Sequence, residues 1–244
     1  MLTLTVLSGK IKNDKIAFHT HTEGFLLVKT CDLFDLAHTL AGDYLSSFGY
    51  PWEALEKLKN YIPQLGKTLH GGEYTEILPE VWAHKTASVS RAANIVGPCI
   101  IGAGTEVRPC AYIRGCALIG ENCVVGNSTE LKNVILFDCV QTPHYNYVGD
   151  SILGYKAHMG AGAVTSNVKA DKTPVTVKGE TKIETGLKKL GSMIGDFAEV
   201  GCNAVLNPGT VVGRNTNIYP LSFVRGVVPP DSILKNDGIL IKKN

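Results

Sequence analysis

From residue 89 onward an aliphatic residue recurs at every sixth position, and a small residue follows four positions later. A period of six fits neither an α-helix nor an alternating strand, and it is typical of a hexapeptide β-helix. We therefore predict a mainly β chain in which three hexapeptides form one triangular coil and residues 18 apart stack on one face. The aliphatic series is Val89, Ile95, Ile101, Val107, Ile113, Ile119, Val125 and Leu131, and the small residues are Ala93, Cys99, Thr105, Ala111, Ala117, Cys123 and Thr129.

The six-residue pattern is interrupted twice. The first break is "FDCVQTPHYNYVGDSILG", residues 137–154, and it contains His144 between a proline and two tyrosines. The second break, residues 168–190, is rich in lysine and contains one proline and two glycines, which is typical of a loop. The pattern resumes at Leu153, Met159 and Thr165, and again at Ile194, Val200, Leu206, Val212, Ile218 and Val224.

These boundaries predict a β-helix over residues 81–228 with an inserted loop at 168–190. The loop is either a solvated hairpin or an arm that reaches a neighbouring subunit. Glycine often follows the aliphatic residue, as in "IGAG" and "VGNS", and we expect it to support the tight turns. The prolines of "PPDSIL" are expected to end the β-helix, so that residues 229–244 form a capping strand or an arm.

Residues 1–80 lack the repeat, and we expect them to form a small α/β cap on the open end of the prism. Residues 1–30 alternate apolar and polar positions and predict strands, whereas the leucine spacing of residues 31–61 predicts helices. His19 and His21 in "FHTHTEG" lie on one face of a predicted strand. They are either a metal-binding pair or solvated or packed strand residues.

Composition narrows the function classes. The chain has 24 Lys+Arg and 22 Asp+Glu, a net charge of +2, so no basic stripe for nucleic acid is present. No apolar run reaches the ~18 residues of a membrane helix, and the N-terminus lacks a secretory signal pattern, so a cytoplasmic location is expected. The seven cysteines include no CxxC pair, and we expect them to serve as small buried residues.

The stretch from Arg114 to Asn167 carries three motifs, "VGNSTELK", "HYNYVGDSILG" and "GAGAVTSN". It resembles the acetyltransferase domain of the bifunctional glucosamine-1-phosphate N-acetyltransferase/uridylyltransferase family. The family's nucleotidyltransferase domain is not expected in this sequence. The resemblance implies a left-handed β-helix, a homotrimer with sites between neighbouring prisms, acetyl-CoA as co-substrate, an amino-sugar phosphate as acceptor, and no metal.

The resemblance also implies roles for single residues. His144 matches the general base, and Asn167 lies near the amine and the thioester. Tyr147 matches a sugar-contacting tyrosine, whereas Ala161 and Cys202 match positions that contact acetyl-CoA. Backbone N–H groups of the "MGAGA" turn are expected to stabilise the tetrahedral intermediate.

Arg114 and Lys132 match the family's sugar-phosphate-binding pair, and their spacing of 18 residues independently predicts that they stack on one face. Adjacent cations repel unless an anion bridges them, and a phosphate suits both a guanidinium and an ammonium group. The alternative is a pair of solvated surface cations.

Two positions depart from the family pattern. His158 stands where a substrate-binding asparagine is usual, and it is either a second proton carrier, a sugar ligand or a surface histidine. Val168 stands where a tyrosine is common. Both changes bear on the identity of the acceptor sugar more than on the reaction type.

Two other functions remain open from the sequence. The first is a non-catalytic sugar-nucleotide sensor, or a partner of a separate nucleotidyltransferase. The second is a zinc hydratase of the γ-carbonic-anhydrase kind, which needs three clustered histidines. The coils contain only His144 and His158, with His84 at their start.

Overall fold

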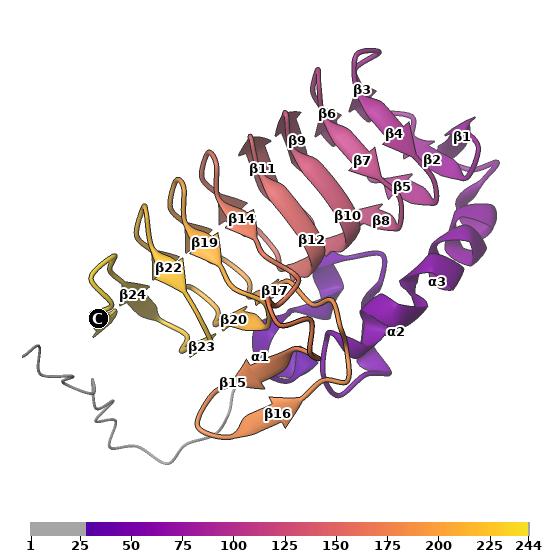
Figure 1. Cartoon of the computed structure of the whole chain (residues 1–244). Helices are drawn as coiled ribbons and strands as arrows, with labels where there is room; N and C mark the ends of the chain where they lie inside the picture. Colours follow the sequence, from indigo (N-terminus) through magenta and orange to yellow (C-terminus); the bar gives the residue numbers. More distant parts are fainter. Residues whose placement is uncertain (1–27, 244) are drawn as a thin grey trace, which may run out of the picture.

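The computed structural model describes residues 28–243, and it confirms the predicted parallel β-helix (Figure 1). The expected strands of residues 1–27, together with His19 and His21, lie outside the described residues. One sheet follows the path β1 (Tyr74–Leu78), β2 (Val81–His84), β5 (Cys99–Ile101), β8 (Ala117–Ile119), β10 (Glu130–Leu136), β12 (Tyr147–Leu153), β14 (Val164–Thr165), β19 (Val205–Leu206) and β22 (Phe223–Val224).

This sheet forms two faces of the prism, because β10 and β12 bend around a corner, and the second sheet forms the third face. Strands β4 (Asn94–Val96) and β7 (Tyr112–Arg114) share the face of β14, β19 and β22, whereas β17 (Ser192–Ile194), β20 (Thr210–Val212) and β23 (Val227–Val228) continue the face of β2, β5 and β8. The second sheet contains β3 (Ser88–Val89), β6 (Glu106–Val107), β9 (Val124–Asn127), β11 (Gln141–His144), β13 (His158–Met159), β18 (Glu199–Val200), β21 (Asn217–Ile218), β24 (Ser232–Leu234) and β25 (Leu240–Lys242).

The aliphatic series fills the prism, as the pattern predicts. From Val107 to Leu131 every member of the series is fully buried, whereas Val89 and Ile95 in the first coil are half-buried. Each strand turns one side chain into the interior and its neighbours outward, as in β7, where Ile113 is buried between two exposed residues. The interior therefore requires one aliphatic residue in each strand.

The coil length changes at the first break of the pattern. Cys99 pairs with Ala117, 18 residues later, but Ala117 pairs with Val134, 17 residues later. The lost residue shortens the corner after Lys132, so β10 and β12 each run continuously across two faces. This one-residue slip explains why the six-residue pattern loses its phase near residue 132.

The glycines after the aliphatic residues have a different purpose from the expected one. A Cβ on Gly102 would lie 2.3 Å from the oxygen of Gly120, and a Cβ on Gly120 would lie 2.7 Å from the backbone nitrogen of Asp138. Positive φ angles at the corners fall on other residues, such as Asn122 and Cys139. The expectation that these glycines support tight turns is therefore wrong, because what requires them is the close approach of successive coils.

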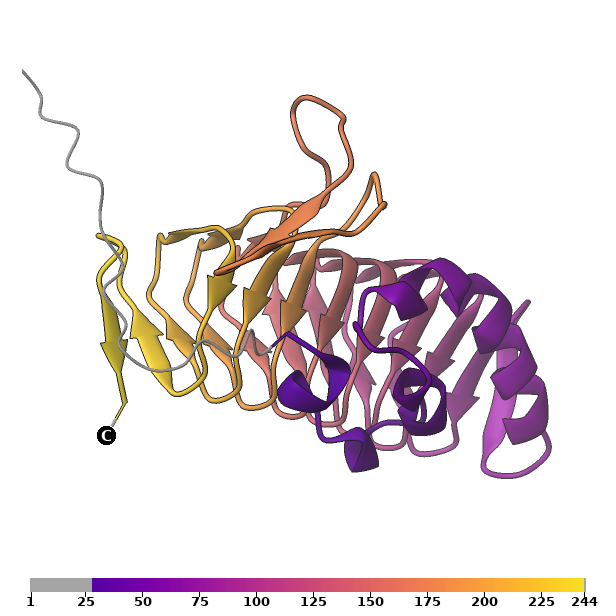
Figure 2. The ribbon, with the colours of Figure 1, turned by 90° about the horizontal axis from the view of Figure 1, so that it is seen from below.

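The N-terminal region covers one lateral side of the prism as well as its end (Figure 2). It contains α1 (Thr30–Leu33), η1 (Leu36–His38), α2 (Gly42–Ser46) and α3 (Glu53–Leu69), of which α3 packs on β5 and β10. Strand β1 closes the first edge by pairing antiparallel with β2. Further along the prism, the carbonyl of His38 accepts a hydrogen bond from the Asp138 N–H at 3.0 Å.

The inserted loop forms an antiparallel hairpin of β15 (Thr176–Lys178) and β16 (Lys182–Glu184). Val175 and Val177 are buried, and the hairpin backbone lies against Gly209 and Gly226 of the same chain. The hairpin is thus a separate two-stranded sheet that packs on the prism, and loops of the insertion project outward (Figure 2).

The C-terminal coil extends past the expected end at residue 228. Strand β24 still pairs in parallel with β21, and β25 then closes the last edge by pairing antiparallel with β24. Pro229 and Pro230 occupy a corner against Gly213 rather than ending the coil. None of the described helices has the length and apolar character needed to cross a membrane.

Candidate active site

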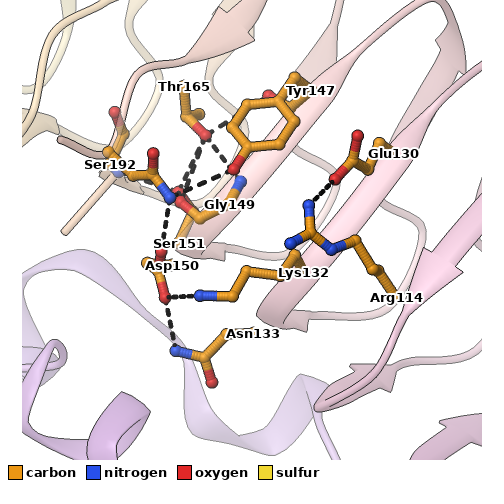
Figure 3. Close-up of polar contacts among 11 residues, drawn as sticks. Arg114, Glu130, Lys132, Asn133, Tyr147, Gly149, Asp150, Ser151, Thr165 and Ser192 are labelled. Carbon is orange, nitrogen blue, oxygen red and sulfur yellow. Dashed lines mark hydrogen bonds and ion pairs between the residues drawn. The ribbon is translucent and has the colours of Figure 1, made fainter. Parts of the chain in front are cut away.

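Arg114 and Glu130 form an ion pair on adjacent coils. Arg114 ends β7 and Glu130 begins β10, and Nη1 of the arginine donates to Oε1 of the glutamate at 2.6 Å (Figure 3). The glutamate raises the pKa of Arg114 above its ordinary value. Glu130 pairs in register with Tyr112, and Leu131 with Ile113, so Lys132 lies beside Arg114 as the spacing predicts.

Lys132 has its own carboxylate partner. Its Nζ donates to Oδ1 of Asp150 at 2.9 Å, and Nδ2 of Asn133 donates to the same oxygen at 2.8 Å (Figure 3). The Asp150 side chain is only 5% exposed. Asn133 and Asp150 have φ of 55° and 48°, at the bend where β10 and β12 cross to the next face, a conformation that Asn and Asp tolerate well.

Asn167 joins the same carboxylate from the following coil. Its Nδ2 donates to Oδ2 of Asp150 at 2.5 Å and to Oη of Tyr147 at 3.2 Å. Burial, followed by the charges of Asp150 and Glu130, raises the pKa of Tyr147, so its hydroxyl keeps its proton at neutral pH. We call Lys132, Asn133, Tyr147, Asp150 and Asn167 the Asp150 cluster.

Gly149 makes room for this cluster. A Cβ at Gly149 would lie 2.5 Å from the hydroxyl of Tyr147 and 3.0 Å from Nδ2 of Asn167. The tyrosine ring therefore folds over a bare stretch of backbone between Lys132 and the next coil.

The carboxylates of Glu130 and Asp150 weaken the prediction that Arg114 and Lys132 need a bound anion. Arg114 and Lys132 do stack, but Glu130 and Asp150 already balance their charges within the chain. Repulsion between the cations therefore does not by itself call for a bound anion. Glu130 was detectable from the sequence, since it lies two residues before Lys132 on the same face of a strand.

His144 lies at the end of β11, at the corner that leads into β12, and it is exposed. Its backbone N–H donates to Oδ1 of Asn146 at 3.2 Å, and its carbonyl accepts from the Gly162 N–H at 3.0 Å. Asn146 is buried and anchors the corner by donating to the carbonyls of Gly160 and Ala163. Within residues 28–243 the imidazole itself has no hydrogen-bond partner.

His158 lies on β13 of the other sheet and outside the Asp150 cluster. Its Nδ1 lies 2.7 Å from Oε2 of Glu199 on β18, and both side chains are partly exposed. A carboxylate on Nδ1 favours the tautomer in which Nε2 is unprotonated. Glu199 is a second partner that sequence reasoning missed.

Ala161 and Cys202 stack on successive coils, since the Asn203 N–H donates to the carbonyl of Ala161 at 2.9 Å. In this turn the N–H groups of Gly160, Gly162 and Ala163 donate to backbone carbonyls. Within the described part of the chain, the N–H of Ala161 donates to no protein group. It is therefore the one donor of the "MGAGA" turn that is free for a ligand.

The structure thus brings some of the predicted site residues together and leaves others apart. Arg114, Lys132, Tyr147 and Asn167 lie on one face, and the last three share contacts with Asp150 or with each other. His144, Ala161 and Cys202 lie at neighbouring turns, His158 is on the second sheet, and Val168 begins the inserted loop. Among residues 28–243, no group of three His, Cys, Asp or Glu side chains is placed to hold a metal ion.

Known proteins match this chain over much of its length. The model of the GMPPB C-terminal domain matches residues 95–188. The bifunctional protein GlmU of Methanococcus maripaludis is 32% identical over 203 residues, which cover 82% of this chain and 49% of that protein. The GlmU of Methanococcus vannielii is 34% identical over 207 residues, with the same coverage of 82% and 49%.

A third relative is the bifunctional sugar-1-phosphate nucleotidylyltransferase/acetyltransferase of Sulfurisphaera tokodaii, 31% identical, with 74% of this chain and 46% of that protein covered. A solved acetyltransferase domain of PglB from Neisseria gonorrhoeae, in complex with acetyl coenzyme A, matches 65% of this chain and 55% of its own at 18% identity and a TM-score of 0.31. The chain spans about half the length of the curated relatives it matches. The relatives confirm the resemblance that the motifs indicate.

Proposed function

We propose that this chain, similar over 82% of its length to bifunctional GlmU proteins, is an acetyl-CoA-dependent N-acetyltransferase. The proposed acceptor is an amino-sugar phosphate such as glucosamine-1-phosphate. The observation that carries the proposal is that Lys132, Tyr147 and Asn167 belong to one polar cluster, of which Tyr147 lies three residues after the exposed His144.

The proposed reaction begins at His144. The imidazole takes a proton as the neutral sugar amine attacks the thioester carbonyl carbon. A C–N bond forms, the C–S bond breaks, and the coenzyme A sulfur leaves with a proton. The free N–H of Ala161 is suited to stabilise the negative oxygen of the tetrahedral intermediate.

Arg114 and Lys132 are the proposed phosphate ligands. Glu130 occupies only one guanidinium nitrogen, and the Arg114 side chain is 48% exposed, so several of its N–H donors face solvent. A phosphate can therefore bind Arg114 while the ion pair with Glu130 persists. Lys132 is 25% exposed and adds charge from the adjacent coil.

The active form is proposed to be a homotrimer. Tyr147, Val164, Val205 and Phe223 follow one another in register on the face that carries the Asp150 cluster. Phe223 is 67% exposed and Val205 is 37% exposed, which is unusual for neighbouring apolar side chains on a single surface. Contact with a second copy would bury them, and would bring partner groups toward the unpartnered imidazole of His144. The cytoplasmic location stays a prediction.

The test is thiol release from acetyl-CoA with a panel of amino-sugar phosphates. We expect His144→Ala to lower kcat at least ~100-fold, as for the loss of a general base. His70→Ala, which removes an exposed histidine outside the site, is the matched control and should leave kcat unchanged.

Other outcomes would favour the alternatives. Unchanged turnover in His144→Ala would remove His144 from the mechanism. Tight sugar-nucleotide binding without any thiol release would favour a non-catalytic binding protein. Zinc in the purified protein together with CO2 hydration would favour the hydratase.

A further inference from the structure

The carboxylate of Asp150 accepts hydrogen bonds from three nitrogen donors. The ammonium group of Lys132 and the side-chain amides of Asn133 and Asn167 all point at its two oxygens, at 2.9, 2.8 and 2.5 Å. The carboxylate is 5% exposed, so water contributes little to its solvation. An ionised carboxylate only accepts hydrogen bonds, and each of its neighbours must therefore present a donor.

This requirement fixes the direction of the Asn167 amide. Because Asp150 cannot donate, Asn167 must turn Nδ2 toward it, and the other hydrogen of Nδ2 goes to Oη of Tyr147. Oδ1 of Asn167 then faces away from the cluster, and no described residue donates to it. Ser192 Oγ is the only fully buried side-chain N or O atom without a partner in residues 28–243, so Oδ1 of Asn167 is not fully buried.

We propose that Asp150 is a positioning residue that fixes Asn167 as a hydrogen-bond acceptor for the amine of the sugar. The inference rests on the proposed N-acetyltransferase function. A neutral primary amine has two N–H groups and one lone pair. One N–H donates to Oδ1 of Asn167, the other gives its proton to His144, and the lone pair is left free to attack the thioester.

The opposite orientation of the amide would block the reaction. An N–H group of Asn167 aimed at the amine would bind the lone pair that must attack. The fixed orientation also selects the acceptor group, because a hydroxyl has one hydrogen and cannot supply both His144 and Asn167. The arrangement therefore favours transfer to nitrogen over transfer to oxygen.

A double-mutant cycle tests whether Asp150 fixes the amide. Asp150→Asn removes the obligatory acceptor, and Asn167→Asp places two carboxylates together, so we expect each to lower Tm. The exchange D150N/N167D restores one amide facing one carboxylate and should recover most of the lost Tm. Additive losses of Tm in the double variant would overturn the proposed coupling.

Kinetics on the same variants test whether Asn167, held by Asp150, accepts a hydrogen bond from the sugar amine. Asp150→Asn should lower kcat about 10- to 100-fold and leave the KM for acetyl-CoA unchanged. The exchange variant keeps an acceptor oxygen toward the substrate and should regain at least ~10-fold of that loss. Asp196→Asn is the control for loss of a buried carboxylate, with a lower Tm and an unchanged kcat.

Two results would overturn the role toward the amine. One is a kcat for Asp150→Asn within twofold of the wild-type value. The other is recovery of Tm without recovery of kcat in the exchange variant. If the wild-type protein transfers acetyl groups to no amine, the proposed function and the amine contact both fail. The pairing of Asp150 with Asn167 is then still decided by the Tm cycle.

Discussion

Asp150 and Asp196 are buried carboxylates at two corners of the same prism, but their hydrogen-bond donors differ. Asp196 accepts from the backbone N–H groups of Asp35 at 2.7 Å and Tyr155 at 2.8 Å, and from the guanidinium of Arg214. Within residues 28–243, the carboxylate of Asp150 accepts only from side chains. Backbone donors connect segments of the chain to each other, whereas side-chain donors orient groups that remain partly exposed. The kind of donor thus separates a carboxylate that maintains the fold from one that organises a site.

The largest expected effect comes from Asp196→Ala. The substitution leaves two backbone N–H groups and a half-buried Arg214 without their acceptor, since Asp196 is 0% exposed and Arg214 is 38% exposed. We expect the free energy of unfolding to fall by about 3 kcal/mol, measured by urea denaturation. Glu56→Ala, an exposed position on α3, is the control. A loss below ~1 kcal/mol would contradict a structural role for Asp196.

Gly149→Ala should affect the Asp150 corner without unfolding the protein. The added Cβ displaces the Tyr147 hydroxyl and the Asn167 amide, which are ends of side chains that can move. We expect kcat to fall about 10-fold with only a small loss of Tm, measured by thiol release and calorimetry. At the control Gly49→Ala, no atom lies within 4 Å of the new Cβ, so neither quantity should change. A large drop in Tm for Gly149→Ala would mean that Tyr147 supports the fold rather than the site.

Asp138 lies on the same side of the prism as Asp196, against η1, and gives the smallest expected effect. Burial raises the pKa of Asp138 above 3.8, and the charge of Glu121 adds to this, whereas His38 and the Glu121 N–H oppose it. The unfolded state therefore loses this proton first, near pH ~4, and stability falls as pH rises from there through the folded-state pKa.

Asp138→Asn removes this loss of stability at higher pH, and it keeps an acceptor for the Glu121 N–H. We expect Tm to rise by about 1–2 °C relative to wild type at pH 7 and by less at pH 4. Glu56→Gln changes the same charge at an exposed position and should show no such pH dependence. An equal rise at both pH values would rule out the carboxylate as its source.

The architecture was largely predictable because a prism of fixed cross-section imposes a strict period on the buried side chains. The 17-residue coil was not, since a single residue lost after Lys132 changes the phase without changing the type of residue. The position of α1, η1 and α3 along the side of the prism could not be predicted from the sequence either. Their leucine stripe shows that a face is buried but does not say against which coil.

The site was predictable in part. Stacking of Arg114 and Lys132 followed from the period and is observed. The carboxylate partners Asp150 and Glu199 were missed. Asp150 lies 18 residues after Lys132, so the period that stacks Arg114 on Lys132 also indicated Asp150, whereas the contact of Glu199 depends on the long inserted loop. The pair of His158 and Glu199, for example, spans 41 residues. The proposed roles of His144, Asn167, Tyr147, Ala161 and Cys202 remain predictions.

The contact of the Asp35 N–H with Asp196 has a consequence for synthesis on the ribosome. The two residues are 161 positions apart in the sequence. At ~5–20 residues per second, the segment around α1 emerges roughly 10–30 s before the carboxylate that holds it. A repeat protein can fold coil by coil as it emerges, because each coil contacts only its neighbours. In this chain the segment around α1 cannot complete its hydrogen bonds to Asp196 until a late coil has been made, so coil-by-coil folding leaves this segment unfinished until then.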